Sequence, residues 1–431
     1  MTGGVVIAAP SSGSGKTVIT LALLRALRAA GIEVGSLKIG PDYIDPGFHR
    51  VASGAECRNY DPWAMRLATL ESQRDCVAGQ VDLIVAEGVT GLFDGAADGT
   101  GSTADAANQL GWPILLVVDV KGQGASAAAL VEGFAHHRKD TKIAGVIFNR
   151  VGSERHRAML ATAMASTGIP ILAMVPRDAV FDLPDRHLGL VQAAELSGLD
   201  RQIDEAAALI SAEIDLTALA DLAGPVTASM LNHAAPPVPP PGQRVAVAAD
   251  DAFSFAYPHI LDGWRDAGTE ISTFSPLADQ APDTRADAVY LPGGYPELHA
   301  GLLAGNRHFM DGIRGATIYG ECGGYMGLGR GLIDRDGKRF EMAGLLPVET
   351  SFAAPRLHLG YRKLTLGEDC FLGMPGEDYR GHEFHYSSQT GVEPVSALFT
   401  AVDATGAALP PAGCRQGNVM GAYIHLIDRA R

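Results

Sequence analysis

The sequence predicts an α/β protein with two domains, and three observations support this fold class. Short apolar runs alternate with helical segments through both halves of the chain, which is typical of parallel sheets covered by helices. The 431 residues exceed what one hydrophobic core usually accommodates. A proline-rich run at 236–242 can form neither a helix nor a central strand. We therefore expect domains at 1–230 and 243–431, joined by a linker at 231–242.

The composition excludes several classes of protein. A net charge of −15 argues against a nucleic-acid partner, because phosphate backbones are bound by concentrated Lys and Arg. The five cysteines show no metal-ligand spacing, which favours reduced thiols over disulfides. We see no signal peptide and no apolar run of about 18 residues, so we expect a cytoplasmic protein that does not cross a membrane.

The first domain opens with a strand at 5–8 and a glycine-rich loop, followed by a helix expected at 18–30. The loop residues are Ser12, Gly13, Ser14, Gly15, Lys16 and Thr17. In such a loop the backbone N–H groups surround phosphate oxygens, Lys16 lies near the terminal phosphates, and Thr17 can hold Mg²⁺. The loop predicts binding of ATP with Mg²⁺, although Pro10 stands where the general pattern has glycine.

Acidic residues follow two of the next strands. The further strands that we expect are 34–39, 81–86, 114–118 and 143–148. The acidic residues are Asp42, Asp45, Glu87 and Asp94. Because the carboxyl ends of parallel strands meet at one edge, these four can meet the phosphate loop, where they would bind Mg²⁺ or position substrate carboxylates. Lys38 would be a second cation for phosphate or a substrate carboxylate, and Tyr43 is a further candidate for substrate contact.

The second domain has a cysteine between a strand and a helix. The elements that we expect before it are strands at 245–248, 271–274, 288–291 and 316–319 and a helix at 258–267. Cys322 is flanked by Gly320, Gly323 and Gly324, as a sharp nucleophile turn requires. We expect its side chain to be exposed at the carboxyl edge of the sheet. The amino terminus of the next helix would favour the thiolate.

A thiolate that attacks an amide needs a base and an oxyanion hole. His425, in a strand expected at 421–426, is the candidate base, and His382 and His385 are rival bases. The oxyanion donors that we expect are backbone N–H groups of Gly293, Gly294 and Gly323.

Six motifs together resemble the cobyrinic acid and hydrogenobyrinic acid a,c-diamide synthases. They occupy residues 9–17, 38–46, 87–95, 183–190, 291–299 and 381–385. The resemblance implies a dethiobiotin-synthetase-like P-loop domain, which accounts for Pro10. A flavodoxin-like class I glutamine amidotransferase domain of the cobyric-acid-synthase type would follow it. Carried over by position, Cys322 is the nucleophile and His425 activates it.

The resemblance implies amidation of the a and c side-chain carboxylates of hydrogenobyrinic or cobyrinic acid in cobalamin biosynthesis. ATP would phosphorylate each carboxylate, with Mg²⁺ as cofactor, and glutamine would supply ammonia. One residue departs from the amidotransferase pattern: Ile427 stands where a glutamate usually follows the histidine. The group that orients His425 therefore stays open.

Other interpretations remain at this point. Within the same chemistry, the chain could be a nickel-sirohydrochlorin a,c-diamide synthase or a cobyric acid synthase, although Gly40-Pro41-Asp42-Tyr43 favours the a,c-diamide group. In a different class, it could be a P-loop regulatory ATPase with a non-catalytic amidotransferase-like module, against which Cys322 and His425 weigh. The oligomeric state is open, and an exposed glycine-rich edge near His382 could form a homodimer.

Overall fold

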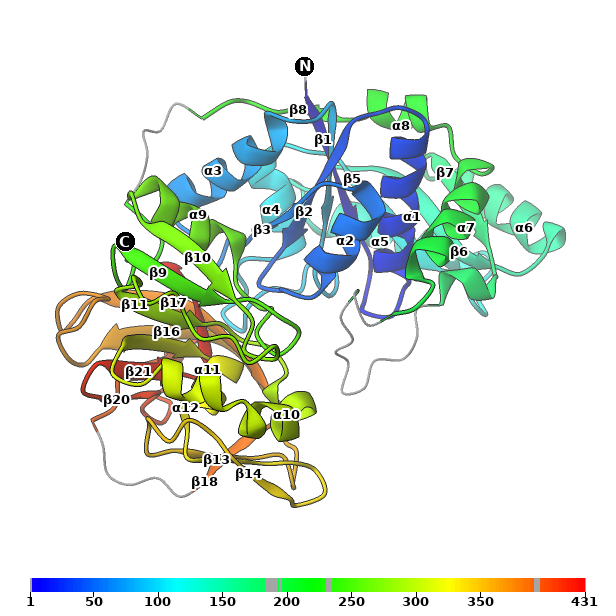
Figure 1. Ribbon diagram of the computed structural model, residues 1–431. Coiled ribbons are helices and arrows are strands. Elements are labelled where there is room, and N and C mark those ends of the chain that lie inside the picture. The colour runs from blue at the N-terminus through cyan, green and yellow to red at the C-terminus, as the bar shows by residue number, and fades with distance from the viewer. Residues whose placement is uncertain (1, 183–192, 194–195, 230–234, 391–395, 431) are drawn as a thin grey trace. The chain divides into compact units, whose positions relative to one another are not determined.

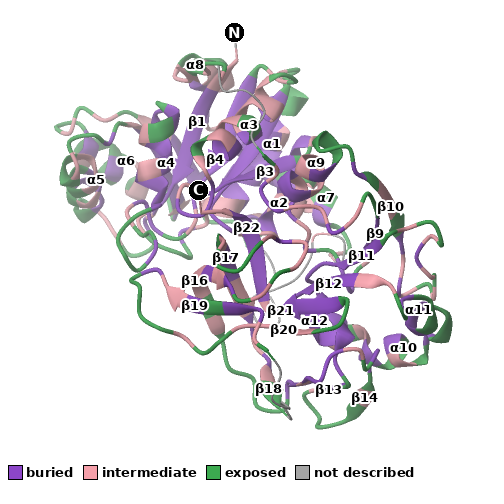
Figure 2. Cartoon of the chain, turned by 90° about the vertical axis from the view of Figure 1, so that its left-hand side faces the viewer, coloured by how far each residue is buried: buried purple, intermediate pink, exposed green. Residues whose placement is uncertain are grey.

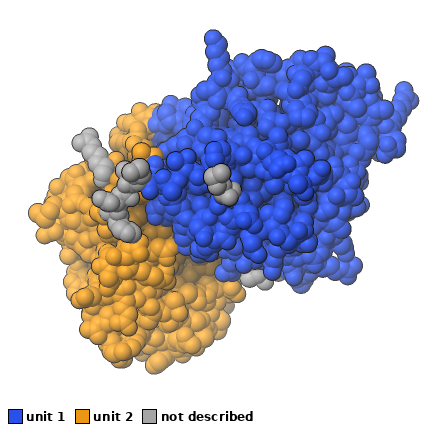
Figure 3. Space-filling model, turned by 90° about the horizontal axis from the view of Figure 1, so that it is seen from above, with its two compact units in different colours: residues 1–63, 70–231 blue, residues 64–69, 232–431 orange. Residues whose placement is uncertain are grey.

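The computed structural model describes all residues except 1, 183–192, 194–195, 230–234, 391–395 and 431. Two compact units make up the chain: residues 1–63 with 70–231, and residues 64–69 with 232–431 (Figure 3). The domain boundaries expected from the sequence stay predictions, because part of the expected linker lies outside the described residues. The motif at 183–190 lies outside them too.

The first unit is built on an eight-stranded sheet in the order β3-β2-β4-β1-β5-β6-β7, with β8 paired to β1 (Figure 1). The strands are β1 (Gly3–Ala8), β2 (Val34–Ile39), β3 (Cys57–Tyr60), β4 (Leu83–Glu87), β5 (Ile114–Asp119), β6 (Ile143–Val151), β7 (Ile171–Pro176) and β8 (Gly224–Pro225). All pairs are parallel except β1 with β8. The apolar runs predicted β1, β2, β4, β5 and β6 but not β7 or β8, and Figure 2 shows the sheet as the buried centre of the unit.

Helices connect these strands. They are α1 (Lys16–Ala29), α2 (Asp45–Ser53), α3 (Leu67–Ala78), α4 (Thr103–Leu110), α5 (Ser126–His137), α6 (Glu154–Met164), α7 (Leu199–Ser211) and α8 (Leu216–Asp221), with a short 3-10 helix η1 (Ala179–Phe181). Helix α1 packs against α2 and α7, and α5 packs against α6. Strand β3 was not predicted, because its sequence Cys-Arg-Asn-Tyr is not apolar throughout, although all four residues are buried.

The second unit begins with a six-stranded sheet in the order β10-β9-β11-β12-β21-β20. Its strands are β9 (Arg244–Ala248), β10 (Glu270–Phe274), β11 (Ala288–Leu291), β12 (Thr317–Glu321), β20 (Cys414–Gln416) and β21 (Val419–Ala422). Its helices are α9 (Pro258–Asp266), α10 (Ala300–Gly305), α11 (Arg307–Gly312) and α12 (Gly323–Leu328), with a 3-10 helix η4 (Pro296–His299). The pairs among β9, β10, β11, β12 and β21 are parallel, as predicted.

Two four-stranded sheets complete the second unit, in the orders β14-β13-β15-β18 and β19-β16-β17-β22. The strands are β13 (Gly331–Ile333), β14 (Arg339–Glu341), β15 (Glu349–Ser351), β16 (His358–Leu366), β17 (Asp378–His385), β18 (Ser388–Thr390), β19 (Phe399–Asp403) and β22 (Ile424–Arg429). The sequence did not predict β13 to β19, because their residues are mostly part-buried and carry no continuous apolar run.

Two expectations about this unit were wrong. The strand expected at 421–426 is in fact two strands, β21 and β22. Tyr423 lies between them, and they belong to different sheets. The edge expected near His382 is not an edge, because β17 pairs with β16 on one side and with β22 on the other. Hydrogen-bonded strands on both sides leave no open edge there for another chain.

The proline-rich run packs on the second unit. The Trp264 indole N–H donates to the Val238 carbonyl at 2.8 Å, and the Arg429 amide donates to the Pro237 carbonyl at 3.1 Å. Val238 is 1% exposed, so this part of the run is held in place. None of the helices in the described residues is long and apolar enough to cross a membrane.

Candidate active sites

The phosphate loop of the first unit has the backbone that its glycines predict. Gly13 and Gly15 have φ of 80° and 84°, in the left-handed region where a side chain is disfavoured. A Cβ on Gly15 would lie 2.2 Å from Nδ2 of Asn149, and this amide nitrogen donates to the Ser14 carbonyl at 3.0 Å. Asn149, at the end of β6, therefore fixes the loop. Sequence reasoning missed it, although a polar residue directly after an apolar strand was the available signal.

Lys16 and Thr17, the last two residues of the loop, both face the Glu87 carboxylate at the end of β4. The Thr17 hydroxyl donates to Oε1 of Glu87 at 2.7 Å, and Nζ of Lys16 lies 3.8 Å from the same oxygen. Burial lowers the pKa of Lys16, while the Glu87 charge raises it and so opposes that effect. The sequence predicted that a carboxylate would meet the loop, and Glu87 is in that place.

A buried ionic cluster surrounds Lys38. Its Nζ donates to Asp45 Oδ2 at 2.7 Å and to Glu87 Oε1 at 2.9 Å, and His49 Nε2 lies 2.6 Å from Glu87 Oε2. Burial alone would raise the pKa of Glu87, but Lys38 and His49 hold it well below its ordinary value. Lys38 is 1% exposed, so it is an internal cation of the site. His49, in α2, is a cluster member that sequence reasoning did not find, since a lone histidine gives no pattern.

The other two acids lie differently. Oδ1 of Asp42 accepts the amides of Ile44 and Asp45 at 2.8 and 3.0 Å, and Tyr43 is half-buried in this turn. Burial, together with the neighbouring Asp45 charge, raises the pKa of Asp42 to about 6. Asp94 is exposed, and its Oδ2 accepts the Gly91 amide at 3.0 Å. Among the described residues, Asp94 has no hydrogen bond to the cluster around Lys38.

The loop of Asp94 nevertheless lies beside the phosphate loop. The Leu92 amide donates to the Ala9 carbonyl at 2.8 Å, and a Cβ on Gly91 would lie 2.7 Å from the Pro10 carbonyl oxygen. The first site therefore combines backbone N–H groups at a helix start, two lysines and several hard oxygen ligands. The Thr17 hydroxyl and the Glu87 carboxylate, in contact with each other, are the kind of oxygen donors that fit Mg²⁺.

In the second unit, Cys322 is in a strained turn between β12 and α12. Its φ is 46° and its ψ is −106°, and it precedes the first residue of α12. A Cβ on Gly324 would lie 1.9 Å from the Leu291 carbonyl oxygen, and one on Gly320 would lie 3.0 Å from the Gly324 backbone. The small neighbours are therefore required by close backbone contact, as the nucleophile-turn interpretation predicts.

Two expectations about this thiol need correction. Cys322 is 3% exposed, because β11, α12 and β17 surround it in the free protein, with Phe384 O at 4.0 Å from Sγ. Burial and then the charge of Glu297 raise the pKa of the thiol, whereas the Gly323 N–H lowers it by less. The resting group is the thiol, so it must lose its proton during attack.

His425 is positioned to receive that proton. It is fully buried in β22, and a Cβ on Gly293 would lie 2.2 Å from its Cε1, 2.8 Å from its Nε2 and 3.3 Å from Cβ of Cys322. The Nε2 edge of the ring and the Cys322 side chain thus both lie against Gly293. Burial, then His382 and His385, lower the pKa of His425 to about 3, which keeps the imidazole neutral and able to act as a base.

The glycines expected to form an oxyanion hole come together. A Cβ on Gly323 would lie 2.8 Å from the Gly294 nitrogen and 3.0 Å from its oxygen, so the turn after β11 contacts the turn at Cys322. The Gly293 carbonyl accepts the Phe255 amide at 2.9 Å, which fixes this turn. The backbones of Gly294 and Gly323 are therefore in close contact, and their role as oxyanion donors stays a prediction.

A buried glutamate lies behind His425. Glu321, the last residue of β12, accepts hydroxyl hydrogen bonds from Tyr319 and Tyr290, both at 2.8 Å, and the Leu426 amide at 3.0 Å. Its Oε2 is 4.0 Å from Nδ1 of His425. Burial raises the pKa of Glu321 to about 7, against the opposing effect of these hydrogen bonds. Glu321 had no predicted role, although an acid directly before the nucleophile was a signal.

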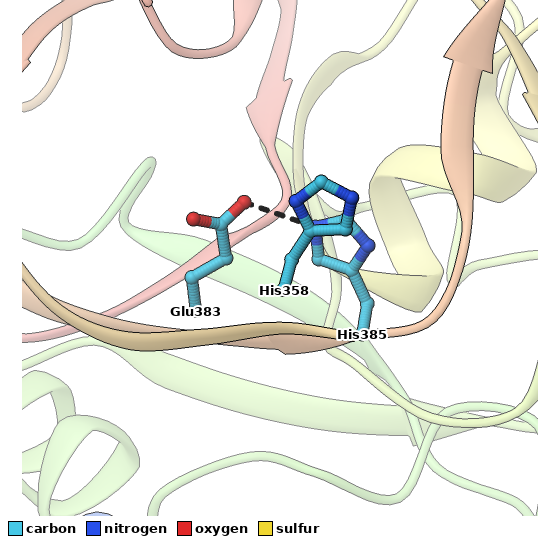
Figure 4. A group of neighbouring side chains, drawn as sticks. All are labelled: His358, Glu383 and His385. Atoms are coloured by element: carbon cyan, nitrogen blue, oxygen red, sulfur yellow. Dashed lines mark hydrogen bonds and ion pairs between the residues drawn. The ribbon is translucent and has the colours of Figure 1, made fainter. Parts of the chain in front are cut away.

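Of the two rival bases, His385 belongs to a group with His358 and Glu383 (Figure 4). His382 is not in that group: it pairs in register with His425, and burial lowers its pKa to about 3. Glu383 accepts from Arg362 at 2.7 Å and pairs with His385 Nε2 at 3.0 Å. The rings of His358 and His385 stack at 4.7 Å with an angle of 10° between planes. His358, Glu383 and His385 are close enough to hold a metal ion, but parallel stacked rings do not direct their nitrogens at one point. We interpret the group as an ionic cluster that packs next to Cys322.

Comparisons with known proteins match the two parts of the chain that hold these sites. A model of the CobQ/CobB/MinD/ParA nucleotide binding domain matches residues 5–191, and one of the CobB/CobQ-like glutamine amidotransferase domain matches residues 244–431.

Several curated relatives that are named hydrogenobyrinate a,c-diamide synthase match over nearly the whole chain. The protein of Rhizobium meliloti strain 1021 is 51% identical over 430 residues, covering 99% of both chains. That of Brucella abortus biovar 1 is 53% identical over 435 residues, covering 99% of this chain and 98% of the relative. That of Rhodobacter capsulatus is 48% identical over 436 residues, covering 98% of each.

Proposed function

The chain belongs to the hydrogenobyrinate a,c-diamide synthase family, and from this premise we propose how its residues carry the reaction. It is an ATP-using, glutamine-dependent ligase of cobalamin biosynthesis, with a P-loop nucleotide-binding domain and a glutamine amidotransferase domain. Its similarity to these synthases over 99% of its length favours this activity over the nickel-sirohydrochlorin and cobyric acid reactions and over a regulatory ATPase. The substrate that the relatives' name supports is hydrogenobyrinate, the metal-free corrinoid.

We assign activation of the substrate to the first unit. A carboxylate resists nucleophiles, and phosphorylation by ATP converts it to an acyl phosphate with a good leaving group. The phosphate loop from Ser12 to Thr17 would hold the nucleotide, and Lys16 would face the transferred phosphoryl group. Mg²⁺ held by Thr17 and Glu87 would neutralise phosphate charge. Lys38 would compensate the carboxylate charge of Glu87 and Asp45 beside the loop.

The remaining first-unit candidates would meet the corrinoid. Asp42 and Tyr43 lie in the turn after β2, and Asp94 lies on the exposed loop beside Pro10. We propose that Asp42 and Tyr43 position the substrate side chain, and that Asp94 contributes to the Mg²⁺ or substrate surface. Because ATP and glutamine are metabolites of the cytoplasm, we expect the enzyme to work there. The homodimer stays a prediction.

Ammonia production belongs to the second unit in this proposal. Sγ of Cys322 attacks the side-chain amide carbon of glutamine, and its proton passes to Nε2 of His425. The N–H groups of Gly294 and Gly323 stabilise the tetrahedral oxyanion. His425 then protonates the leaving nitrogen, which departs as ammonia. Water, deprotonated by the same ring, hydrolyses the thioester to glutamate. Ammonia attacks the acyl phosphate, which gives the amide and releases phosphate.

The placement of Cys322 beside neutral, buried His425 across Gly293 is the observation that carries this assignment. It is tested with hydrogenobyrinic acid, ATP and either glutamine or ammonium salt, with product amides counted by mass spectrometry. We expect Cys322→Ala to lose glutamine hydrolysis but to keep ammonium-dependent amidation. We expect Lys16→Ala to lose amidation from both nitrogen sources and to keep some glutamine hydrolysis. Glutamine hydrolysis that survives Cys322→Ala would disprove the assignment.

A further inference from the structure

We propose that Glu321 is the positioning residue of His425 and completes a Cys322–His425–Glu321 triad. The inference rests on the proposed function, because it assumes that Cys322 and His425 hydrolyse glutamine. Its acid comes from β12, the strand that carries the nucleophile. The acid is not on β22, where Ile427 occupies the usual place.

The hydrogen bonds of Glu321 leave one acceptor position directed toward the histidine. Oε1 accepts from the Tyr319 hydroxyl at 2.8 Å and from the Leu426 amide at 3.0 Å. Oε2 accepts from the Tyr290 hydroxyl at 2.8 Å and lies 4.0 Å from Nδ1 of His425. A carboxylate oxygen accepts two hydrogen bonds, so Oε2 can also accept Nδ1–H. Catalytic hydrogen bonds are often long in the free enzyme and shorten with substrate bound.

The same carboxylate holds the strand of the histidine. Leu426 directly follows His425, and its amide bonds to Glu321 at the end of β12. Strand β22 belongs to a different sheet from β12, and the two are not hydrogen-bonded as neighbours. The Glu321 side chain therefore supplies a fixed link between the strand that carries Cys322 and the strand that carries His425. Two tyrosine hydroxyls hold the carboxylate itself in one orientation.

The orientation of the ring has a chemical consequence. The Cε1 and Nε2 edge of His425 faces Gly293 and the Cys322 side, while Nδ1 faces Glu321. With its proton on Nδ1 directed at Glu321, the imidazole has an unprotonated Nε2 for the thiol. When Nε2 takes the proton of Cys322, the carboxylate stabilises the imidazolium. The proton then leaves with ammonia, and Glu321 stays ionised throughout.

The groups around this pair decide its response to pH. Glu321 faces the hydroxyls of Tyr290 on β11 and Tyr319 on its own strand. His425 faces Tyr257 at 6.2 Å between ring centres and pairs in register with His382 on β17. Because burial raises the pKa of Glu321 to about 7, the carboxylate becomes protonated as the pH falls through that value. Glutamine hydrolysis by the natural enzyme should fall over the same range.

The test is Glu321→Gln in the full-length enzyme, which keeps the size of the side chain and removes its charge. We expect kcat for glutamine hydrolysis to fall roughly 10²- to 10⁴-fold, with a much smaller change in KM. The decrease near pH 7 should disappear from the residual activity, and ammonium-dependent amidation should be unchanged. Glu270→Gln, the same substitution at an exposed position on β10, is the matched control and should keep the natural kcat.

Two results would overturn the role of Glu321. One is a Glu321→Gln enzyme with natural kcat and pH profile. The other, independent of any variant's folding, is a ¹⁵N NMR spectrum of the natural enzyme that shows His425 protonated on Nε2, assigned by loss of the signal in His425→Gln. If Cys322→Ala itself keeps glutamine hydrolysis, the proposed function fails instead, so the two failures are distinguishable.

Discussion

At the scale of the residue, Gly293 decides whether thiol and base can meet. Its position has no room for a side chain, because a Cβ there would overlap Cε1 of His425 at 2.2 Å. The sequence predicted Gly293 as a source of oxyanion donors, a role that stays a prediction. The structure adds a steric reason for glycine, which no pattern in the chain could reveal, since His425 is 132 residues away (425 − 293).

We expect Gly293→Ala to reduce glutamine hydrolysis by about 100-fold or more, because the methyl group displaces the His425 ring from the thiol. Ammonium-dependent amidation should remain, since the nucleotide site is in the other unit. Gly305→Ala, at the end of α10 where a Cβ meets nothing within 4 Å, is the matched control and should be fully active. Equal hydrolysis by both variants would contradict the steric argument. Glutamine hydrolysis by both variants is measured as the initial rate of glutamate release.

At the scale of the element, helix α2 is attached to the central sheet through an ionic contact. His49 in α2 meets Glu87 at the end of β4, and Glu87 in turn meets Lys38 at the end of β2. All three side chains are almost completely buried. The sequence predicted β2 and β4 and their acids from apolar runs, but it predicted no helix at α2. Helix α2 has only nine residues, and its buried face contains both polar and apolar side chains. Its sequence therefore shows no clear helical spacing of apolar residues.

This contact predicts how the first unit responds to alkaline pH. Burial alone would lower the pKa of His49, but Cys57 and Glu87 raise it to about 10. Protonated His49 therefore stabilises the folded first unit. This stabilisation is complete below the ordinary histidine pKa of about 6.5 and is lost as the pH rises through about 10. We expect His49→Gln to lower the unfolding temperature at neutral pH. Between neutral pH and pH 10, the unfolding temperature of this variant should fall less steeply than that of the natural protein. The exposed His136→Gln should match the natural protein in a thermal unfolding series; a natural slope in His49→Gln would contradict the assignment.

At the scale of the whole molecule, we propose that the two units carry the two halves of one reaction and that ammonia connects them. Ammonia that equilibrated with solvent would be protonated to ammonium at neutral pH and lose its nucleophilicity. We therefore expect delivery from glutamine to avoid that equilibrium.

Amidation by Cys322→Ala with ammonium salt should rise about tenfold per pH unit below the pKa of ammonium, because free ammonia is the nucleophile. Amidation by the natural enzyme with glutamine should not follow that slope. The measurement is the initial rate of amide formation over a pH series, with each nitrogen source at fixed total concentration. Parallel slopes for glutamine and ammonium would show that the ammonia passes through bulk solvent.

The sequence by itself determined the α/β class, the strand-loop-helix at the phosphate site and the strand-cysteine-helix at the nucleophile. These features are local: apolar runs, glycines and a reactive residue lie within a few positions of one another. The tertiary structure decided which distant side chains meet them. Asn149 under the phosphate loop, His49 on Glu87 and Glu321 behind His425 each act across strands that the topology brings together. The burial that keeps Cys322 a thiol and His425 neutral has the same origin, because solvent exclusion comes from packing of the whole unit.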